Sequence, residues 1–345
     1  MIFGKKPRMM AKFKKHYDKH RNNKFIAGHD KEFAPWGFTL NYDNKCNFRC
    51  QHCFTKSSLG DFGKSTLSLE DVKSLADQAD ELGCFEVDIQ GGEPLMNKDL
   101  FNILEAVDTS RFYTYLTSNG WFMTEEMAKK LAEAGVDRVL ISIDSFTPEE
   151  HDKFRGKKGA YERAMQAMKY IKDAGMRAFF SVTIGNYNAQ SKELEDFTKF
   201  AAANKYGLIF NCASPSGAWK GHYDMMMSEA DTKKVEELRA NNPEIIRDLW
   251  NILDSSNLIV GCPAVNFFYV NPYGDILPCV FMHTSMGNIK EKPLKDILMH
   301  GFEFEQLNKL SPKCLTGENI DFAKKYLNQE TSVMQPMMID EFFKA

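Results

Sequence analysis

This sequence of 345 residues lacks long apolar runs, a secretory signal and a marked excess of charge. No uninterrupted apolar stretch approaches the ~18 residues of a membrane span, and the mean hydropathy is −0.42, so no membrane span is expected. The N-terminus has no continuous apolar segment of the secretory type, which predicts a cytoplasmic protein. With 43% hydrophobic residues, the chain can bury one large core and a smaller satellite domain.

Cysteine is sparse, with eight residues, and its short spacings are typical of metal binding rather than of a disulfide framework. Cys46, Cys50 and Cys53 follow an apolar extended run with the spacing C-x3-C-x2-C. Thiolates this close on a loop can bind three irons of a [4Fe-4S] cluster and leave the fourth iron open to a substrate or cosubstrate. A zinc knuckle and buried free thiols are the alternatives.

The cysteine triad resembles the signature of the radical S-adenosylmethionine (SAM) enzymes, which place an aromatic residue, here His52, just before the third cysteine. The resemblance implies that Cys46, Cys50 and Cys53 bind a [4Fe-4S] cluster and that SAM chelates its open iron. It also implies that one electron cleaves SAM, so that a 5'-deoxyadenosyl radical abstracts a substrate hydrogen. A reductant such as flavodoxin or ferredoxin would then be a partner.

Charge is distributed unevenly along the chain. Residues 1–24 carry nine Lys or Arg against Asp18, a balance of +8, which leaves −11 for the remainder of a chain whose net charge is −3. Met9, Phe13 and Tyr17 recur at four-residue steps, which predicts a short basic amphipathic helix. Its apolar stripe could pack on the main domain with its lysines in solvent, or the helix could contact an anionic membrane surface or nucleic acid. Disorder is the third possibility.

From Trp36 onward, strand-like and helix-like segments alternate at intervals that suit βαβ units. This alternation predicts an α/β fold, and its six βα repeats fit the partial (βα)6 barrel of the radical SAM family. No repeat is evident in the sequence itself. Strands are expected over 36–42, 85–90, 112–117, 138–144, 178–184 and 208–211, and helices over 68–82, 99–107, 124–134, 161–174 and 191–203.

Polar motifs at strand ends are candidates for the active site, because loops after the carboxyl ends of parallel strands build it in such folds. Gly91, Gly92 and Glu93, followed by Pro94, resemble the GGEP motif of the family, whose backbone and carboxylate recognise the amino group of SAM. Glycines permit close approach of the backbone to a ligand. An ordinary Gly-Pro turn is the alternative.

The third and fourth strands end in further polar residues. Ser118 and Asn119 belong to a segment that resembles the TNG-type turn of the family, and a polar loop without a ligand is the alternative. Ser142 and Asp144 would lie near the barrel mouth. Similar strand ends in relatives contact the SAM ribose, so Ser142 is the first candidate for that contact and Asp144 the second.

The segment 151–156, HDKFRG, resembles an HDxxRG element whose arginine binds the SAM carboxylate, which makes Arg155 the candidate. A guanidinium suits this contact because its planar fork can pair with both carboxylate oxygens. A surface salt bridge is the alternative. On the fifth strand, Val182 or Thr183 would flank the adenine by the same resemblance.

A second group of cysteines lies in the C-terminal part. Cys262, Gly274 and Cys279 form C-x11-G-x4-C, which resembles the opening of SPASM and Twitch auxiliary-cluster domains, and the intervening sequence predicts a hairpin with a type I turn. Full SPASM domains have seven cysteines and Twitch domains usually supply four ligands, whereas here Cys314 is the remaining one. We therefore expect an auxiliary [4Fe-4S] cluster with three ligands, its fourth site taken by substrate, water or a side chain such as His283. A structural zinc or buried thiols are the alternatives.

Two cysteines belong to neither group. Cys84 starts a strand and is expected in the core. Cys212 follows the sixth strand, where its thiol could face the barrel mouth. In radical SAM epimerases a cysteine returns a hydrogen atom to the substrate radical, so Cys212 is a candidate catalytic residue, with a core thiol as the alternative.

The sequence patterns divide the chain into five parts. We expect a basic N-terminal segment over 1–35, the partial barrel over 36–225, a helical linker over 226–257, a Twitch-like cluster domain over 258–320 and a C-terminal tail over 321–345.

The resemblance implies an enzyme that abstracts hydrogen from a small-molecule or peptide substrate. The auxiliary cluster would accept an electron, giving oxidation, dehydrogenation or cross-linking, or would bind the substrate directly. The 35 residues before the barrel look too short for a leader-recognition domain, which favours a small molecule or a short peptide. The alternatives are a redox-neutral epimerase that uses Cys212, polar transfer of the aminocarboxypropyl group of SAM, and a non-catalytic iron–sulfur electron carrier.

Overall fold

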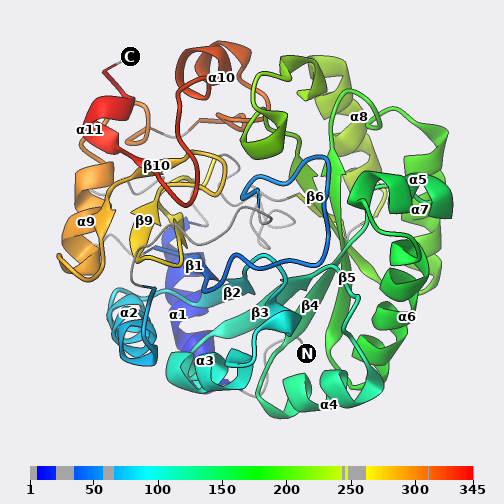
Figure 1. Cartoon of the computed structure of the whole chain (residues 1–345), viewed down its shortest axis with the longest axis horizontal. Helices are drawn as coiled ribbons and strands as arrows, with labels where there is room; N and C mark the ends of the chain where they lie inside the picture. The colour runs from blue at the N-terminus through cyan, green and yellow to red at the C-terminus, as the bar shows by residue number, and fades with distance from the viewer. Residues whose placement is uncertain are drawn as a thin grey trace.

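One curved sheet, with helices packed on its outside, organises the computed structural model (Figure 1), which describes residues 6–20, 35–56, 66–242, 245–247, 262–309 and 311–344. Neighbouring strands from β1 to β7 pair in parallel and in chain order. They are β1 (Gly37–Asn41), β2 (Glu86–Gln90), β3 (Tyr113–Ser118), β4 (Arg138–Ser142), β5 (Arg177–Ile184), β6 (Gly207–Cys212) and β7 (Ile245–Arg247). The predicted α/β fold is confirmed, and β1 to β6 lie where strands were expected.

Helices follow the strands of the barrel. The first, α2 (Leu69–Glu81), begins and ends at the expected signals, whereas α5 (Pro148–Arg155) lies where no helix was expected. At α2, the Ser68 hydroxyl accepts from the backbone N–H of Asp71, whose carboxylate accepts from the N–H of Ser68 in return. Gly83 follows with φ +94°, a conformation that favours glycine. The helices of the barrel are α2 (Leu69–Glu81), α3 (Leu100–Val107), α4 (Glu125–Glu133), α5 (Pro148–Arg155), α6 (Ala160–Asp173), α7 (Lys192–Ala203) and α8 (Glu229–Ala240).

The C-terminal hairpin continues the sheet of the barrel. β8 (Phe267–Val270) pairs in parallel with β1, β9 (Asp275–Leu277) returns antiparallel to β8, and β11 (Gly287–Asn288) pairs with β9. The expected hairpin is confirmed. The sequence did not indicate that its first strand would pair with β1, which brings the second cysteine group to the same end of the barrel as the first.

The segments expected as a helical linker (226–257) and as a C-terminal tail (321–345) contain more helices and strands than expected. The segment expected as a helical linker contains α8 and also β7, which adds a strand beside β6. The segment expected as a tail includes most of α10 (Ile320–Tyr326), β12 (Met337–Met338) and α11 (Ile339–Phe342). β12 pairs with β10 (Thr284–Ser285), and α9 (Leu294–Gly301) packs beside α2. The C-terminal residues therefore cover the auxiliary segment.

The basic helix α1 (Pro7–His20) packs under the barrel, at the amino ends of its strands. Met9 is 1% exposed and joins a buried cluster that includes Phe85 and Tyr113. The Lys6 ammonium donates to the carbonyl oxygens of Phe112 and Gly135 at 3.0 and 2.7 Å. The interpretation in which the apolar stripe packs on the main domain is confirmed, while a contact of other basic residues with an anionic surface stays a prediction.

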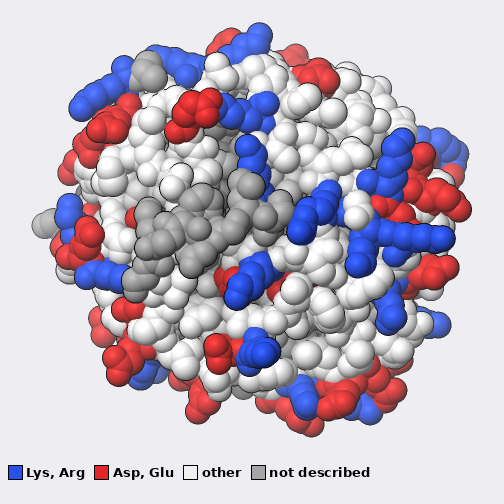
Figure 2. Space-filling view, viewed as in Figure 1, with Lys and Arg blue, Asp and Glu red and all other residues white. Residues whose placement is uncertain are grey.

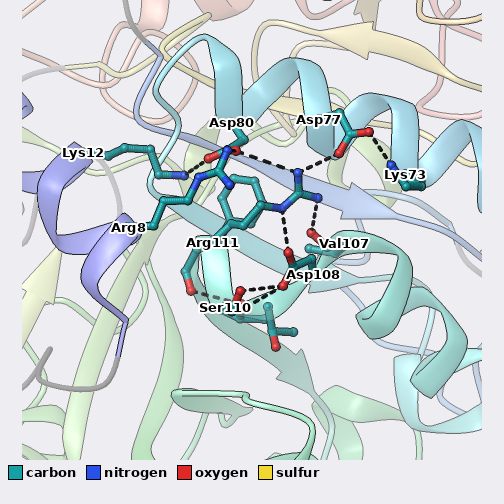
Figure 3. A network of polar contacts seen from close by, with 12 residues as sticks. Arg8, Lys12, Lys73, Asp77, Asp80, Val107, Asp108, Ser110 and Arg111 are labelled. Atoms are coloured by element: carbon teal, nitrogen blue, oxygen red, sulfur yellow. Dashed lines mark hydrogen bonds and ion pairs between the residues drawn. The ribbon is translucent and has the colours of Figure 1, made fainter.

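Ion pairs join α2 to α1 on one side and to the turn before β3 on the other (Figure 3). Asp80, whose side chain is 2% exposed, pairs with Arg8 and with Lys12, the latter at 2.7 Å. Arg111 pairs with Asp77 at 2.7 Å and donates to the carbonyl oxygen of Val107. Burial lowers the pKa of Lys12, and the Asp80 carboxylate opposes that effect. The buried carboxylate of Asp80 therefore adds to the apolar contacts that hold α1 against the barrel.

Replacing Asp80 with Ala is expected to lower the free energy of unfolding by at least about 2 kcal/mol, because the largely buried Lys12 loses its counter-charge. Urea denaturation followed by circular dichroism measures this change. The matched control is Asp196→Ala, which removes a 56% exposed carboxylate from an i,i+4 pair with Lys192 and should cost less than about 1 kcal/mol. Equal losses in the two variants would contradict the role of Asp80.

Acidic and basic side chains are interspersed over the face shown in Figure 2, among the residues that the figure colours. This visible face offers no extended patch of one sign. Among the helices described here, none is both long and apolar enough to cross a membrane.

Candidate active site

A cavity of about 450 Å³ opens at the carboxyl ends of the strands, within the size range of small-molecule sites. Its wall combines the first cysteine loop, the ends of β2 to β6 and the C-terminal hairpin. The expected site residues that line it are Cys46, Cys50, His52, Cys53, Gly91, Gly92, Glu93, Ser118, Asn119, Ser142, Arg155, Cys212 and Cys279. Asp144, Val182, Cys262 and Cys314 do not line it.

Close backbone contacts at three glycines hold the cysteine loop. A Cβ atom on Gly92 would lie 2.2 Å from the carbonyl oxygen of Lys45, and one on Gly217 would lie 2.3 Å from the Cα of Phe54. Gly156 ends α5 with φ +64° and lies under the carbonyl of Arg49. Each position therefore admits only glycine without movement of the loop. Hydrogen bonds complete the clamp: Glu93 N–H to Lys45 O at 2.8 Å, Gln51 N–H to Phe154 O at 3.0 Å and Ala218 N–H to Cys53 O at 3.0 Å.

The thiols of the loop meet polar donors at the cavity wall. The N–H of Phe48 donates to the sulfur of Cys46 at 3.4 Å, and Nη1 of Arg155 lies 3.7 Å from the sulfur of Cys50. Burial raises the pKa of Cys46 to about 12, so the free thiol would stay protonated. Bound iron would reverse this preference, and the donors would stabilise the thiolate. Three half-buried thiols on one loop facing one cavity fit a cluster with an open iron.

The carboxylate of Glu93 lies against the next strand end. Its oxygens accept from the backbone N–H of Asn119 and the hydroxyl of Ser118, both at 2.7 Å, and from the N–H of Leu95 at 3.1 Å. Burial raises the pKa of Glu93 to about 7, although these donors work against the rise. The motif residues expected after β2 and β3 therefore form one hydrogen-bonded unit at the cavity. A cationic group from a ligand would favour the ionised carboxylate.

Arg155 is buried between the cysteine loop and β4. Its Nη2 pairs with Oδ2 of Asp144 at 2.6 Å, and the two side chains are 9% and 0% exposed, so this is not the surface salt bridge considered as an alternative. Burial opposes ionisation of Asp144, but the charge of Arg155 lowers the pKa of this carboxyl below its usual value. The expected ribose contact of Asp144 is not supported, because its side chain is turned to Arg155. Asp144 instead positions the guanidinium beside Cys50.

Three further expectations concern His52, Ser142 and the fifth strand. His52 is enclosed by the rings of Phe154 and Trp219, with centroids 4.9 and 5.6 Å away, and burial lowers its pKa to about 4. Ser142 lines the cavity as expected. Of the two residues proposed to flank an adenine, Val182 lies in the core between sheet and helices, whereas Thr183 lines the cavity. The choice of Val182 is not supported.

The sequence motifs did not predict that several polar side chains lie on the inner face of the barrel. Asp88 is 4% exposed and accepts from the hydroxyl of Thr117 at 3.2 Å. The Asn41 side-chain amide donates to the Tyr269 hydroxyl at 2.6 Å, and that of Asn211 donates to the Ser181 hydroxyl at 2.8 Å. The available signal in β2 was the alternation of polar Glu86, Asp88 and Gln90 with apolar Val87 and Ile89, which places the three polar side chains on one face.

The second cysteine group lies behind and beside the same cavity. Cys279 is at the cavity wall, and the N–H of Phe281 donates to its sulfur at 3.4 Å. Cys262 and Cys314 are buried, and burial together with the nearby Cys314 thiol raises the pKa of Cys262 to about 12. His283, considered as a fourth ligand, borders a separate small pocket with Ser216 and Glu330.

In the part of the chain that the structure describes, no three His, Cys, Asp or Glu side chains converge closely enough for one metal ion. The four thiolates of a [4Fe-4S] cluster bind different irons and stand farther apart than the ligands of a single zinc ion, so this spacing is compatible with a cluster. The prediction that Cys84 is a core thiol is confirmed by its complete burial.

Family models locate two domains in the chain. The model of the radical SAM superfamily matches residues 40–201, and that of the SPASM iron-sulfur cluster-binding domain matches residues 262–317. An AdoMet-dependent heme synthase of Oleidesulfovibrio alaskensis is 33% identical over 286 residues, which cover 76% of this chain and 74% of that protein. The chain belongs to the radical SAM superfamily.

Other similar proteins cover a comparable part of the chain. A PqqA peptide cyclase of Rhizobium meliloti is 32% identical over 279 residues, covering 76% of this chain and 73% of that protein. Among solved structures, native anSMEcpe with bound AdoMet has a TM-score of 0.61 and 21% identity, covering 90% of this chain and 96% of that one. Streptococcus suis SuiB bound to precursor peptide SuiA has a TM-score of 0.62 and 18% identity, covering 86% and 69%. The two structures show the likeness of fold.

Membership in the radical SAM superfamily settles the fold type and the cofactor class. The protein is an enzyme with the partial barrel of this superfamily and a C-terminal iron–sulfur domain. Its cofactors are [4Fe-4S] clusters and SAM. The residues that would hold the SAM-binding cluster are Cys46, Cys50 and Cys53, and those expected at the auxiliary cluster are Cys262, Cys279 and Cys314.

Proposed function

We propose that this enzyme cleaves SAM reductively and abstracts a hydrogen atom from a small-molecule or peptide substrate, which is then oxidised with the help of the auxiliary cluster. The observation that carries the proposal is the composition of the cavity wall. Cys46, Cys50 and Cys53 lie on one side, and Cys279 with Val280 and Phe281 of the C-terminal hairpin lies on another. A substrate in this cavity would therefore be within reach of both cofactors.

The side chains around the cysteine loop would bind and orient SAM. The reduced cluster, when bound, supplies the electron that splits the sulfonium. Glu93, held by Ser118 and Asn119, would accept hydrogen bonds from the SAM ammonium. Arg155, fixed by Asp144, would pair with the SAM carboxylate. Ser142 and Thr183 both line the cavity, where Ser142 would contact the ribose and Thr183 would flank the adenine.

The inner face of the barrel would bind the substrate. Asp88, Asn211 and Tyr269 present a carboxylate, an amide and a phenol to the cavity, so a substrate with hydrogen-bonding groups would be oriented there. The relatives include an AdoMet-dependent heme synthase and a PqqA peptide cyclase. Our proposal therefore keeps both a small molecule and a peptide as possible substrates. A flavodoxin or ferredoxin of the cytoplasm would supply the electrons.

The proposal is tested by anaerobic reconstitution with iron and sulfide, followed by incubation with SAM and dithionite. Chromatography with mass spectrometry is expected to show 5'-deoxyadenosine. Methylthioadenosine would indicate polar transfer of the aminocarboxypropyl group instead, and no cleavage product at all would contradict the enzyme proposal. With a substrate, a product lacking two hydrogen atoms supports oxidation, whereas unchanged composition with deuterium uptake from heavy water indicates epimerisation.

The buried carboxyl of Glu93 predicts how SAM binding depends on pH. With a pKa of about 7, raised by burial, Glu93 is protonated below this pH and cannot balance the SAM ammonium. Lowering the pH from 7.5 to 6 should therefore weaken SAM binding about eightfold, the ratio of the ionised fractions. Equilibrium dialysis of the reconstituted protein measures this change.

Two variants separate Glu93 from other groups that titrate. Glu93→Gln should bind SAM more weakly, and this part of the pH dependence should disappear. Glu86→Gln is the matched control, because burial also raises the pKa of Glu86 to about 7 although it does not line the cavity. If SAM binding by Glu93→Gln still weakened as the pH falls, a group other than Glu93 would be responsible for the pH dependence.

A further inference from the structure

The thiol of Cys212 lies where the barrel meets the auxiliary segment. Cys212 is the last residue of β6 and is 2% exposed. Its side chain forms a hydrogen bond with that of Cys314, about a hundred residues later in the chain. Cys212 also borders the cavity that Cys279 lines. A cysteine of the barrel is therefore in direct contact with one of the auxiliary cysteines.

Gly317 lies against Cys212 and Cys314, and there is no space for a side chain at its position. A Cβ atom on Gly317 would lie 2.5 Å from the Cβ of Cys212 and 3.4 Å from the sulfur of Cys314. The N–H of Gly317 donates to the sulfur of Cys314 at 3.1 Å, and the Thr316 hydroxyl lies 3.4 Å from it. Hydrogen-bond donors around a sulfur are typical of iron–sulfur ligands.

Backbone hydrogen bonds bring the other auxiliary cysteines to the same place. The N–H of Cys262 donates to the carbonyl oxygen of Ser311 at 2.8 Å, three residues before Cys314. The N–H of Val265 donates to the carbonyl oxygen of Pro278 at 2.8 Å, and Pro278 directly precedes Cys279. The four thiols thus come from four different segments, which is the arrangement that a cluster enclosed on several sides requires.

We propose that Cys212 is the fourth cysteine ligand of the auxiliary [4Fe-4S] cluster, together with Cys262, Cys279 and Cys314. On cluster insertion the Cys212 thiol releases its proton to solvent and its sulfur bonds to the iron that the other three cysteines leave open. The inference rests on the auxiliary cluster of the proposed function. It assigns that cluster to electron transfer, because no iron remains open for substrate, and it removes Cys212 as a hydrogen-atom donor.

The test uses the full chain with Cys46, Cys50 and Cys53 replaced by Ala, so that only the auxiliary cluster is reconstituted. Iron and sulfide are counted, and the dithionite-reduced cluster is examined by electron paramagnetic resonance with and without cyanide, which binds an open iron. The spectrum of this parent protein is expected to be unchanged by cyanide. Adding Cys212→Ala should shift the spectrum and make it respond to cyanide, or should remove at least half of the iron. Cys84→Ala, at a buried core thiol, is the matched control and should behave as the parent.

Each outcome decides between the possibilities. A parent spectrum that responds to cyanide would overturn the inference without any variant at Cys212, so a folding defect of that variant does not obscure the answer. Identical iron content, spectrum and cyanide response in the parent and in Cys212→Ala would also overturn it. A parent with no iron at all would instead refute the auxiliary cluster itself, and hence this part of the proposed function. Cys212→Ser is the conservative variant, and its spectrum is expected to differ from that of the parent because an oxygen ligand replaces the sulfur; a spectrum identical to the parent's would count against the inference.

Discussion

Replacing Cys46, Cys50 and Cys53 together with Ala is expected to reduce 5'-deoxyadenosine formation to the background level. These three thiols lie on one loop at the cavity, beside the Glu93 and Arg155 side chains. Without them no open iron is held beside Glu93 and Arg155, so bound SAM would have no electron donor. The reconstituted wild type should contain about eight irons and the variant about four. Iron analysis and product chromatography on the same samples measure both quantities.

The control for the triple variant is Cys84→Ala. Cys84 is buried between sheet and helices and does not line the cavity, so its loss should leave iron content and SAM cleavage close to those of the wild type. If the triple variant still formed 5'-deoxyadenosine, the assignment of the cluster to these cysteines would be wrong. A wild type with about four irons would instead count against the auxiliary cluster.

The barrel could be predicted from the sequence because its signals are local. Each strand of the barrel holds at least two apolar residues in a short segment, and side-chain caps such as Ser68 mark where helices begin. Motifs at the strand ends then follow from the rule that parallel strands present their carboxyl ends together. Glu93 and Asn119 were placed at the cavity by this rule, and Cys46 and Arg155 by the family resemblance of their motifs; all four line it.

The sequence alone could not predict which residues of a fully buried strand point into the barrel and which point toward the helices. All but the first and seventh residues of β5 are buried, because helices cover its outer face and the barrel interior its inner face. Apolar and polar residues therefore give little indication of which face points inward. Ser181 and Thr183 line the cavity while Val182 between them packs in the core, and only the tertiary structure distinguishes the two phases.

Contacts between segments that are far apart in the chain could not be predicted from the sequence either. The pairing of β8 with β1 and the contact of Cys212 with Cys314 join residues far apart in the chain, and neither has a local signal. The ion pair of Asp144 was missed for a similar reason: its strand-end position suggested a ligand contact, but α5 brings Arg155 to its carboxylate. Such ion pairs depend on how a helix packs, which spacing alone does not define.

Gly92→Ala is expected to disrupt the cysteine loop and lower SAM cleavage at least about 100-fold, the order of loss that follows a displacement of ~1 Å at a reacting group. The added methyl would lie 2.2 Å from the carbonyl oxygen of Lys45 and 2.6 Å from that of Asn44, and backbone atoms cannot rotate away. The loop must therefore move. That movement breaks the hydrogen bonds of Gly92 N–H to Asp43 O and of Glu93 N–H to Lys45 O, at 2.7 and 2.8 Å.

Gly175→Ala is the matched control, because it adds the same methyl group at a glycine where that group would meet no other atom. Gly175 has φ +82° and no atom within 4 Å of an added Cβ, so its replacement should cost about 1–2 kcal/mol of backbone strain without affecting the cluster. Gly92 itself is not among the glycines of positive φ, so the expected loss there comes from space alone. Iron content, SAM cleavage and the unfolding midpoint of both variants separate the two effects. A Gly92→Ala protein with normal iron and normal cleavage would show that the cysteine loop is not held by this contact.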